Sequence, residues 1–393
     1  MDRFLFADGE YICLYNDGKI VRRHSGFIQN YKEASLGLER AKNWKHSGEG
    51  AQFRGDVIAP QTEEENFVGN VNGVHFTGES AEVVYSFTVG GTSGIYKVNL
   101  DDEKAPEVHV INSVDYSFTG GCLDAEAGVL ATRIDGGRGV SDIALFDMKS
   151  GDYKTVTEGD TLDDDPFVSP DDGNTIYFTS RGIGRDSGGA FAGYSNSAVC
   201  KLDLSAMDIS EVLASEKYNY IKPVFHGGRL YVIKTPAKEK GANPLLEIIL
   251  IPFRIIQAIA NFINLFVTAF TGKSLASGGD NPAKGRNYDG RKEYVKGNLI
   301  NAEREMKKNR KKEKGDYGFI PLSWQLIEAE SGKVIKSGVG DYDILSDGTF
   351  IVTNGRRIFA VKDGKSKKLC DTEKCLRVTA LHRSGKKTDL FEL

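Results

Sequence analysis

Short stretches in which apolar and polar residues alternate recur along the whole chain of 393 residues. Each is followed by a turn rich in Asp, Gly and Ser and then by a second alternating stretch. Because successive side chains of a strand point to opposite faces, this pattern predicts a β-hairpin. Six stretches share it: YICLYNDGKIVRR from Tyr11, GIYKVNLDDEKAPEVHV from Gly94, DIALFDMKSGDYKTV from Asp142, AVCKLDLSAMDISEVL from Ala198, SWQLIEAESGKVIKSG from Ser323 and RIFAVKDGKSKKL from Arg357.

Most of these hairpins follow another pair of strands joined by a tight turn, as in HFTGESAEVVYSF from His75 and DILSDGTFIVTN from Asp343. Four strands that recur at roughly 35 to 55 residues predict the blades of a β-propeller. The sequence therefore predicts an all-β fold with a single β-propeller of six blades, and seven blades is the alternative. A strand at residues 376–382, or the final residues 388–393, is expected to join the N-terminal strands in one blade and close the ring.

One of these strand pairs has a more specific sequence. The stretch DDDPFVSPDDGNTIYFTSRG from Asp163 resembles the Asp-Pro-Ser-Pro-Asp-Gly repeat of TolB-like propellers, which is also found in the propeller of prolyl oligopeptidases. The match is good in this blade and loose in the others. The resemblance implies a propeller fold and no particular activity, because propellers carry many unrelated functions.

Two insertions interrupt the repeat. The first follows Arg23 and contains NYKEASLGLERAKNWK, a predicted helix that belongs either to an extra degenerate blade or to a decoration. The second lies between the second and third strands of one blade. It divides the chain into a first propeller part (residues 1–234), an insertion (235–317) and a last propeller part (318–393).

The second insertion contains LLEIILIPFRIIQAIANFINLFVTAF, residues 245–270, whose only charges are Glu247 and Arg254. At helical spacing its polar residues fall on one line, which leaves a narrow polar stripe on a very apolar helix. Exposed apolar surface of this extent needs an apolar partner. The residues expected to contact a membrane are Phe253, Ile256, Ile259, Phe262, Ile263, Phe266, Val267 and Phe270.

A simple transmembrane span is not the favoured interpretation of this stretch. About 20 residues from Pro252 would reach roughly 30 Å, which is the thickness of the hydrocarbon layer. However, the strands on either side belong to the same blade, and a single crossing would place them on opposite sides of the bilayer. A helix in the membrane plane, or a short re-entrant hairpin bent at Pro252, returns the chain to its own side. The alternative is a helix packed against the propeller, or against its twin in a homo-oligomer.

A basic run follows the apolar stretch, with twelve Lys and Arg against five Asp and Glu between Lys284 and Lys314. A helix is predicted at residues 299–312. Apolar burial together with basic residues near anionic lipid is the usual pair of signals for peripheral membrane attachment. Nucleic acid is a less favoured partner, because aromatic residues in the run are limited to Tyr288 and Tyr294. The residues expected to contact anionic lipid are Lys307, Lys308, Arg310, Lys311, Lys312 and Lys314.

Propeller geometry also predicts that the two faces of the ring differ. The insertion and the loops that begin at Val89, Asp135 and Arg181 all connect the second and third strands of a blade, so they leave from one face. The helical segment after Arg23 joins the same face if it connects two blades. We therefore expect a decorated face close to the membrane and a plain face opposite.

No catalytic signature is present in the sequence. There is no G-x-S-x-G elbow, and the six histidines are spread over different blades without ligand spacing. Five scattered cysteines describe neither a disulfide framework nor a zinc site. An acidic cluster could hold Ca²⁺, although its position in the repeat favours a role in shaping the strand entry, and we expect no cofactor; the cluster is Asp160, Asp163, Asp164 and Asp165.

The start of the chain, MDRFLFADGEYICLY, lacks the basic region and apolar core of a secretory signal, which predicts a cytoplasmic protein. The favoured function is a non-catalytic interaction scaffold on the inner face of the membrane, attached through the amphipathic helix and the basic segment. Its loops or its rim would bind a protein partner. The alternative is a propeller enzyme, a hydrolase or lyase, with a site in the central funnel; the inserted helix would then serve packing or dimerisation.

Overall fold

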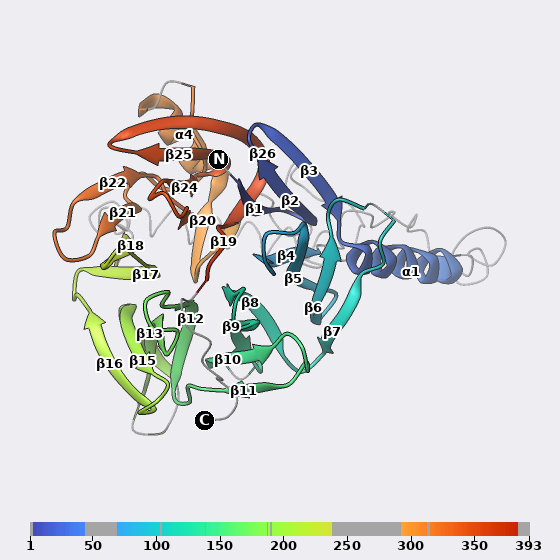
Figure 1. The fold of residues 1–393 in the computed structure, drawn as a ribbon, viewed down its shortest axis with the longest axis horizontal. Helices are drawn as coiled ribbons and strands as arrows, with labels where there is room; N and C mark the ends of the chain where they lie inside the picture. Colours follow the sequence, from blue (N-terminus) through green and yellow to red (C-terminus); the bar gives the residue numbers. More distant parts are fainter. Residues whose placement is uncertain are drawn as a thin grey trace, which may run out of the picture.

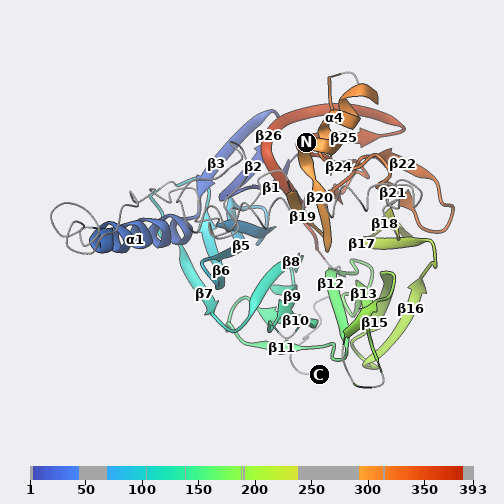
Figure 2. The same cartoon turned by 180° about the vertical axis from the view of Figure 1, so that it is seen from behind.

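In a computed structural model the chain forms a ring of antiparallel sheets that follow one another in chain order (Figures 1 and 2). The structure describes residues 3–43, 69–237, 292–312 and 315–383, apart from Glu103, Arg138, Ser187, Gly189 and Ala190. The strands form groups of four principal strands, the blades, and neighbouring blades are joined into larger sheets in two places. The fold is a six-bladed β-propeller.

The second to fifth blades are each formed by one continuous run of chain or by one run with an insertion. Blade 2 contains β4 (Asn70–Phe76), β5 (Glu82–Val89), β6 (Thr92–Asn99) and β7 (Val108–Ser113). Blade 3 contains β8 (Ser117–Asp124), β9 (Val129–Asp135), β10 (Ser141–Asp147) and β11 (Tyr153–Thr155). Blade 4 contains β12 (Thr161–Val168), β13 (Thr175–Arg185), β15 (Ala198–Asp203) and β16 (Asp208–Leu213), and blade 5 contains β17 (Tyr218–His226), β18 (Arg229–Pro236), β21 (Gln325–Glu328) and β22 (Val334–Ser337).

The ring is closed by β26 (Lys365–Thr379), a strand shared by two blades. Its first part pairs with β25 (Gly355–Lys362) and completes blade 6, whose inner strands are β23 (Asp341–Ile344) and β24 (Phe350–Thr353). Its last part, from Cys375 to Thr379, pairs with β1 (Arg3–Asp8). Blade 1 continues outward through β2 (Tyr11–Asn16) and β3 (Lys19–His24). The predicted closing strand near residue 376 is thus confirmed, whereas residues 388–393 lie outside the described residues.

All six predicted hairpins form the two outer strands of a blade, from β2 and β3 in blade 1 to β25 and β26 in blade 6. Their alternating apolar residues are buried between neighbouring blades. Ile12, Ile95, Ile143 and Ile358, for example, are fully buried. The all-β propeller predicted from the alternation is therefore confirmed, and the strands of the described residues form six blades.

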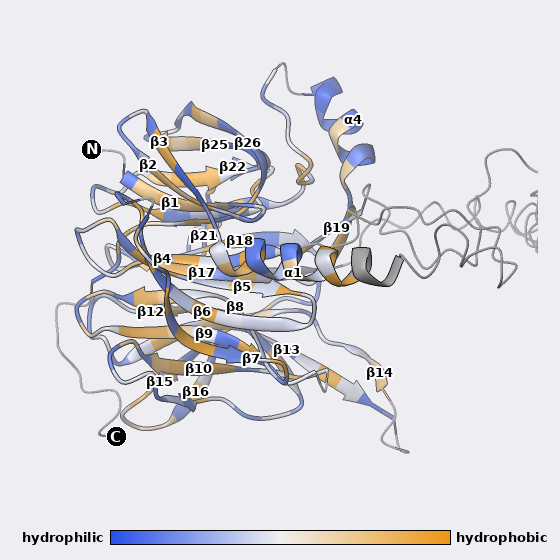
Figure 3. Cartoon of the chain, turned by 90° about the vertical axis from the view of Figure 1, so that its right-hand side faces the viewer, coloured by the Kyte–Doolittle hydropathy of each residue, from blue (hydrophilic) through white to orange (hydrophobic). Residues whose placement is uncertain are grey.

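The structure also confirms one decorated face (Figure 3). On it lie the helix α1 (Gly26–Asn43), the helix α4 (Ala302–Lys312), the short strand β14 (Phe191–Tyr194) and the strand β19 (Lys292–Val295). α1 follows blade 1 in the chain, so the described part of the segment after Arg23, up to Asn43, forms a helix and contributes no strand of a further blade. Among the described residues, no helix has both the length and the apolar character needed to cross a membrane.

The helix predicted at residues 299–312 begins later than expected. Residues up to Asn301 form β20 (Asn298–Asn301), which pairs with β19, and α4 begins at Ala302. The side chain of Asn301 fixes this boundary, because its Oδ1 accepts a hydrogen bond from the backbone N–H of Arg304 at 2.9 Å. Acidic residues in the first turn and basic residues in the last turn complement the helix dipole.

Candidate functional sites on the two faces

Helix α4 carries five of the six cations that were predicted to contact anionic lipid, and Lys314 lies outside the described residues. The eight predicted membrane-contact residues, from Phe253 to Phe270, also lie outside them. The buried side chain of Asn309 holds α4 against the propeller by donating to the carbonyl oxygens of Gly318 and Ile320 at 3.0 and 2.8 Å. The opposite side of the helix is therefore left exposed.

These five cations of α4 fall into two groups. Lys307 and Lys308 are each paired with a glutamate one turn earlier, at 2.6 Å from Glu303 and 3.1 Å from Glu305. Arg310, Lys311 and Lys312 are exposed and form no ion pair with any residue that the structure describes. Their charge is available to an anionic surface.

A hairpin of the insertion lies near the centre of the ring, on the side of the decorated face (Figures 1 and 3). It consists of β19 and β20, and its turn contains Lys296 and Gly297, both with left-handed φ angles of 44° and 76°. Val295 and Ile300 are buried in the same apolar cluster as residues of blades 3 to 6. The hairpin is thereby held with its turn at the ring axis.

The turn of this hairpin ends in a buried group of charges, which we call the central charge cluster: Lys296, Asp165, Asp341 and Arg377. The Nζ atom of Lys296 lies 2.6 Å from Oδ1 of Asp165 and 3.1 Å from Oδ1 of Asp341. Arg377 Nη1 lies 3.1 Å from the same oxygen of Asp165. The cluster joins blades 1, 4 and 6 to the insertion.

β-Bulges in the inner strands aim charged residues at the axis. The register shifts between Asp164 and Phe167 in β12, and between Ile221 and Val224 in β17. Asp165 and Lys222 occupy these bulges with φ angles of 50° and 53°, and each precedes a proline. A bulge re-aims a side chain and tolerates the missing N–H of proline. These two dipeptides are the sequence signal for charged residues at the axis, which the hairpin pattern alone did not reveal.

Neighbouring opposite charges keep the acidic and basic groups in and around the cluster ionised. Burial would raise the pKa of Asp165, but the charges of Lys296, Arg377 and Lys222 outweigh it and hold that pKa well below its usual range. Burial would likewise lower the pKa of Lys222, but Asp341, Asp165 and Asp343 raise it overall. Because these charged groups are buried together and balance one another, the cluster binds the hairpin and offers no accessible base or nucleophile.

The plain face has a central funnel with a cavity of about 590 Å³. Its wall is formed by the ends of inner strands and by the residues after β26. Phe76, Phe225 and Leu345 supply apolar surface, and Arg3 and Arg383 lie at the rim with Glu79. A cavity with apolar walls and a few polar groups is the usual form of a binding site.

A histidine–aspartate pair lies at the funnel wall. His382 Nε2 is 2.7 Å from Oδ2 of Asp343, which also accepts a hydrogen bond from the backbone N–H of Ala380 at 2.8 Å. Burial would raise the pKa of Asp343, but His382 and Lys222 outweigh it and lower that pKa overall. Asp343 therefore stays ionised and orients the imidazole. Sequence spacing gave no signal for this pair, because the two residues come from different blades.

The acidic cluster considered for Ca²⁺ is dispersed in the structure. Asp160 pairs with Arg185, Asp164 with Arg133, and Asp165 belongs to the central charge cluster. Asp163 is buried and accepts a hydrogen bond from the Ser180 hydroxyl at 2.7 Å. Within the described residues no group of three or more His, Cys, Asp or Glu is arranged to hold a metal ion.

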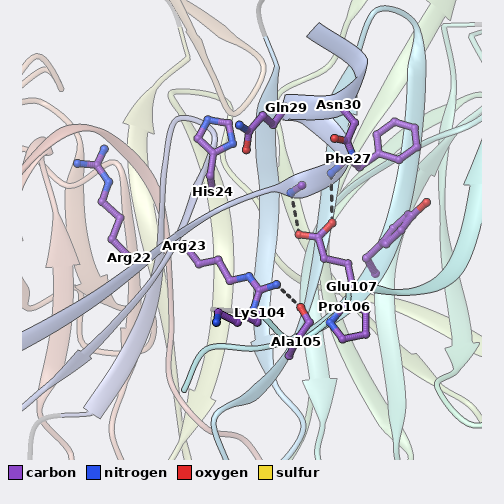
Figure 4. Close-up of a pocket in the computed structure, with 12 residues that line it drawn as sticks. Arg22, Arg23, His24, Phe27, Gln29, Asn30, Lys104, Ala105, Pro106 and Glu107 are labelled. Atoms are coloured by element: carbon purple, nitrogen blue, oxygen red, sulfur yellow. Dashed lines mark hydrogen bonds between the residues drawn. The ribbon is translucent and has the colours of Figure 1, made fainter. Parts of the chain in front are cut away.

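A cleft of about 660 Å³ lies at the ring edge between β3, the start of α1 and the segment before β7 (Figure 4). Two of its charged groups join blade 2 to α1 and to β3. The Glu107 carboxylate accepts hydrogen bonds from the backbone N–H groups of Gly26 and Phe27 at 2.8 and 3.2 Å. Arg23 donates to the carbonyl oxygens of Asn99, Asp102 and Ala105. We therefore assign this cleft a role in holding the helix on blades 1 and 2.

Replacing Glu107 with glutamine is expected to destabilise the protein by about 1 kcal/mol, because a neutral amide satisfies fewer of the helix N–H groups and loses the attraction of the helix dipole. Thermal unfolding monitored by circular dichroism would report the loss. Glu211→Gln on the exposed strand β16 is the control and should leave the midpoint unchanged. Equal midpoints for the two variants would contradict the capping role of Glu107.

No family model matches this chain, and no curated protein does either. Among solved structures the chain is similar to a TolB protein from Agrobacterium tumefaciens, with 17% identity, a TM-score of 0.33, and coverage of 60% of this chain and 72% of that one. It is similar to an oligogalacturonate lyase in complex with manganese at 8% identity and a TM-score of 0.33, covering 59% of this chain and 57% of that one. It is also similar to a puromycin hydrolase, with 12% identity and a TM-score of 0.33; the match covers 42% of this chain and 25% of the hydrolase. The chain thus spans about a quarter of that hydrolase, and likenesses this low transfer no activity.

Proposed function

We propose that this protein is a non-catalytic propeller scaffold whose decorated face rests on the cytoplasmic surface of a membrane. The observation that carries the proposal is the placement of the insertion in blade 5. β18 and β21 are paired neighbours, so the chain leaves blade 5 after Pro236 and returns to it from the same face, which also carries the exposed cations of α4. The plain face, with its funnel, is then free for a protein partner.

The energetics of such an attachment combine two contributions. Each Lys or Arg close to anionic lipid contributes about 1 kcal/mol, and Arg310, Lys311 and Lys312 are exposed and unpaired among the described residues. Burial of the apolar residues of the insertion contributes in proportion to the apolar area removed from water. We therefore expect binding that requires the insertion and that weakens as anionic lipid is removed or salt is added.

Flotation with liposomes tests the attachment. Wild-type protein should float with vesicles that contain phosphatidylserine and float less with phosphatidylcholine alone. A variant that lacks residues 243–277 should remain at the bottom of the gradient with both. Equal flotation of the deletion variant and wild type, or no flotation of either, would show that the membrane proposal is wrong.

A matched pair of triple variants tests the role of charge. Arg310→Gln, Lys311→Gln and Lys312→Gln together should weaken binding to phosphatidylserine vesicles by about 100-fold, which corresponds to about 1 kcal/mol for each cation. The control combines Lys333→Gln, Lys365→Gln and Lys367→Gln, which removes the same charge from exposed turns and edges of blades 5 and 6. The control should bind like wild type, and an equal loss in both variants would exclude a localised contact at α4.

The His382–Asp343 pair favours a second candidate, a hydrolase or lyase with its site in the funnel. An imidazole held by a carboxylate beside a cavity can act as a general base. A panel of chromogenic esters, aminoacyl substrates and oligouronates, assayed with wild type and His382→Gln, separates the candidates. If wild type turns over a substrate and His382→Gln does not, the protein is an enzyme. If wild type and His382→Gln show the same rate on every substrate, the result supports the scaffold.

A further inference from the structure

We propose that the hairpin of β13 and β14 is a second membrane contact, separate from the insertion, which enters the headgroup region with Phe191 and Tyr194. This inference rests on the proposed function, since it requires that the decorated face meets a membrane. It identifies a described part of the chain that would set the orientation of the propeller on the lipid surface.

The hairpin leaves the body of blade 4. β13 pairs with β15 from Thr175 to Ser180 and with β12 as far as Gly182, and beyond that point its residues up to Arg185 pair with β14. Figure 3 shows β14 projecting from the decorated face in the same direction as α4. Arg185 braces the ribbon through two hydrogen bonds of 2.7 Å to the carboxylate of Asp160. The protrusion is therefore held in place from one end.

The projecting strand exposes two aromatic rings to water. Phe191 is 57% exposed and Tyr194 is 52% exposed, and their ring centroids lie 4.8 Å apart. A two-stranded ribbon is at best marginally stable in water unless something covers it. Phe191 lies opposite Arg185, which is exposed, and Tyr194 lies opposite Ile183, which is half-buried. Lipid headgroups, which surround a protruding ribbon, fit this exposure better than a groove on a partner protein, which would cover only one side of the ribbon.

Three features of the same face point to lipid as that medium. Tyrosine and phenylalanine suit the boundary between water and acyl chains, because one end of the tyrosine ring is polar. Other large side chains on this face are also exposed: Val114 and Tyr116 between β7 and β8, and Tyr294 and Leu299 on the central hairpin. The unpaired cations of α4 add attraction for anionic headgroups. The open backbone edges of the ribbon limit it to a shallow depth.

Vesicle titration of the double variant Phe191→Ala and Tyr194→Ala tests the proposal. Binding to vesicles with phosphatidylserine should weaken roughly tenfold, because two exposed rings no longer leave water. The control is Ile209→Ala with Val212→Ala, a pair of comparably exposed residues on the outer strand β16 of the same blade. Circular dichroism of both variants should match wild type, since neither pair supports the core.

A site-specific probe gives a second readout. Phe191→Trp should show blue-shifted emission when vesicles are added, relative to wild type, and should be quenched by a nitroxide on the headgroup more than by one deep in the acyl chain. If the alanine variant binds like wild type and the tryptophan emission does not shift, the hairpin proposal is wrong. In that case loss of binding on deletion of residues 243–277 would still support the proposed function, so the two failures are distinguishable.

Discussion

Replacing Lys296 with methionine is expected to destabilise the protein by about 3 kcal/mol, because it leaves two buried carboxylates with fewer opposite charges. The side chains of Lys296 and Asp165 are only 3% and 2% exposed, and their charged atoms lie 2.6 Å apart. Arg377 remains beside Asp165 and prevents a larger loss. Urea unfolding followed by tyrosine and tryptophan fluorescence would measure the shift in midpoint.

Helix α4 offers a control with the same geometry in a different environment. Lys307 lies 2.6 Å from Glu303, but these side chains are 74% and 43% exposed. Lys307→Met is expected to change stability by no more than about 0.5 kcal/mol, because water screens the pair. Equal shifts for Lys296→Met and Lys307→Met would refute the structural role of the central charge cluster.

The interaction between Lys296 and Asp165 can be isolated by a double-mutant cycle. Asp165→Asn alone leaves Lys296 facing Asp341, at 3.1 Å. The double variant should be less destabilised than the sum of the two single variants, since it leaves neither member of the pair buried alone. Release of the hairpin should also increase proteolysis after Lys292, a site that all three variants keep, and limited trypsin digestion would detect it.

The fold could be predicted from the sequence because its signals are local. Each outer hairpin, such as β2 and β3, lies within one short alternating stretch and its turn, and the closing strand follows from the need to cover the edge of β1. The first residues of the predicted helix at 299–312 were misassigned because the turn at Lys296 and Gly297, which makes β20 a strand, was not recognised.

The sites depend on residues that are distant in sequence, and this is why they were not predicted. Lys296 and Asp165 are 131 positions apart, and Arg377 and Asp165 are 212 apart. Alternation places a residue on a face of a strand, but it does not indicate which blade lies opposite across the channel. The residues before Pro166 and Pro223 were the only local signal in the sequence. They indicate a bulge that turns a charged side chain toward the axis, but they do not identify the residue that it contacts.

Acidification from pH 8 to pH 5 is expected to destabilise the protein by about 2 kcal/mol through His75 alone. His75 is 2% exposed, and neither ring nitrogen has a hydrogen-bond partner among the described residues. Burial, with the charge of Lys222, lowers its pKa from 6.5 to about 3. At pH 5 the ring is neutral in the folded protein and protonated in the unfolded chain. The contribution of His75 to the free energy of unfolding is therefore complete above pH 6.5 and is lost as the pH falls toward 3.

Urea midpoints at pH 8, 6 and 5 for wild type and His75→Gln would test this linkage. Glutamine has a similar size and does not titrate, so the variant should lose most of the slope between pH 6.5 and 5, whatever its stability at pH 8. Asp165 and Asp343 do not contribute in this window, because their lowered pKa values make their own losses begin only below about pH 4. An unchanged slope in His75→Gln would mean that the ring is protonated in the folded protein, and the proposal of a neutral buried histidine would then be wrong.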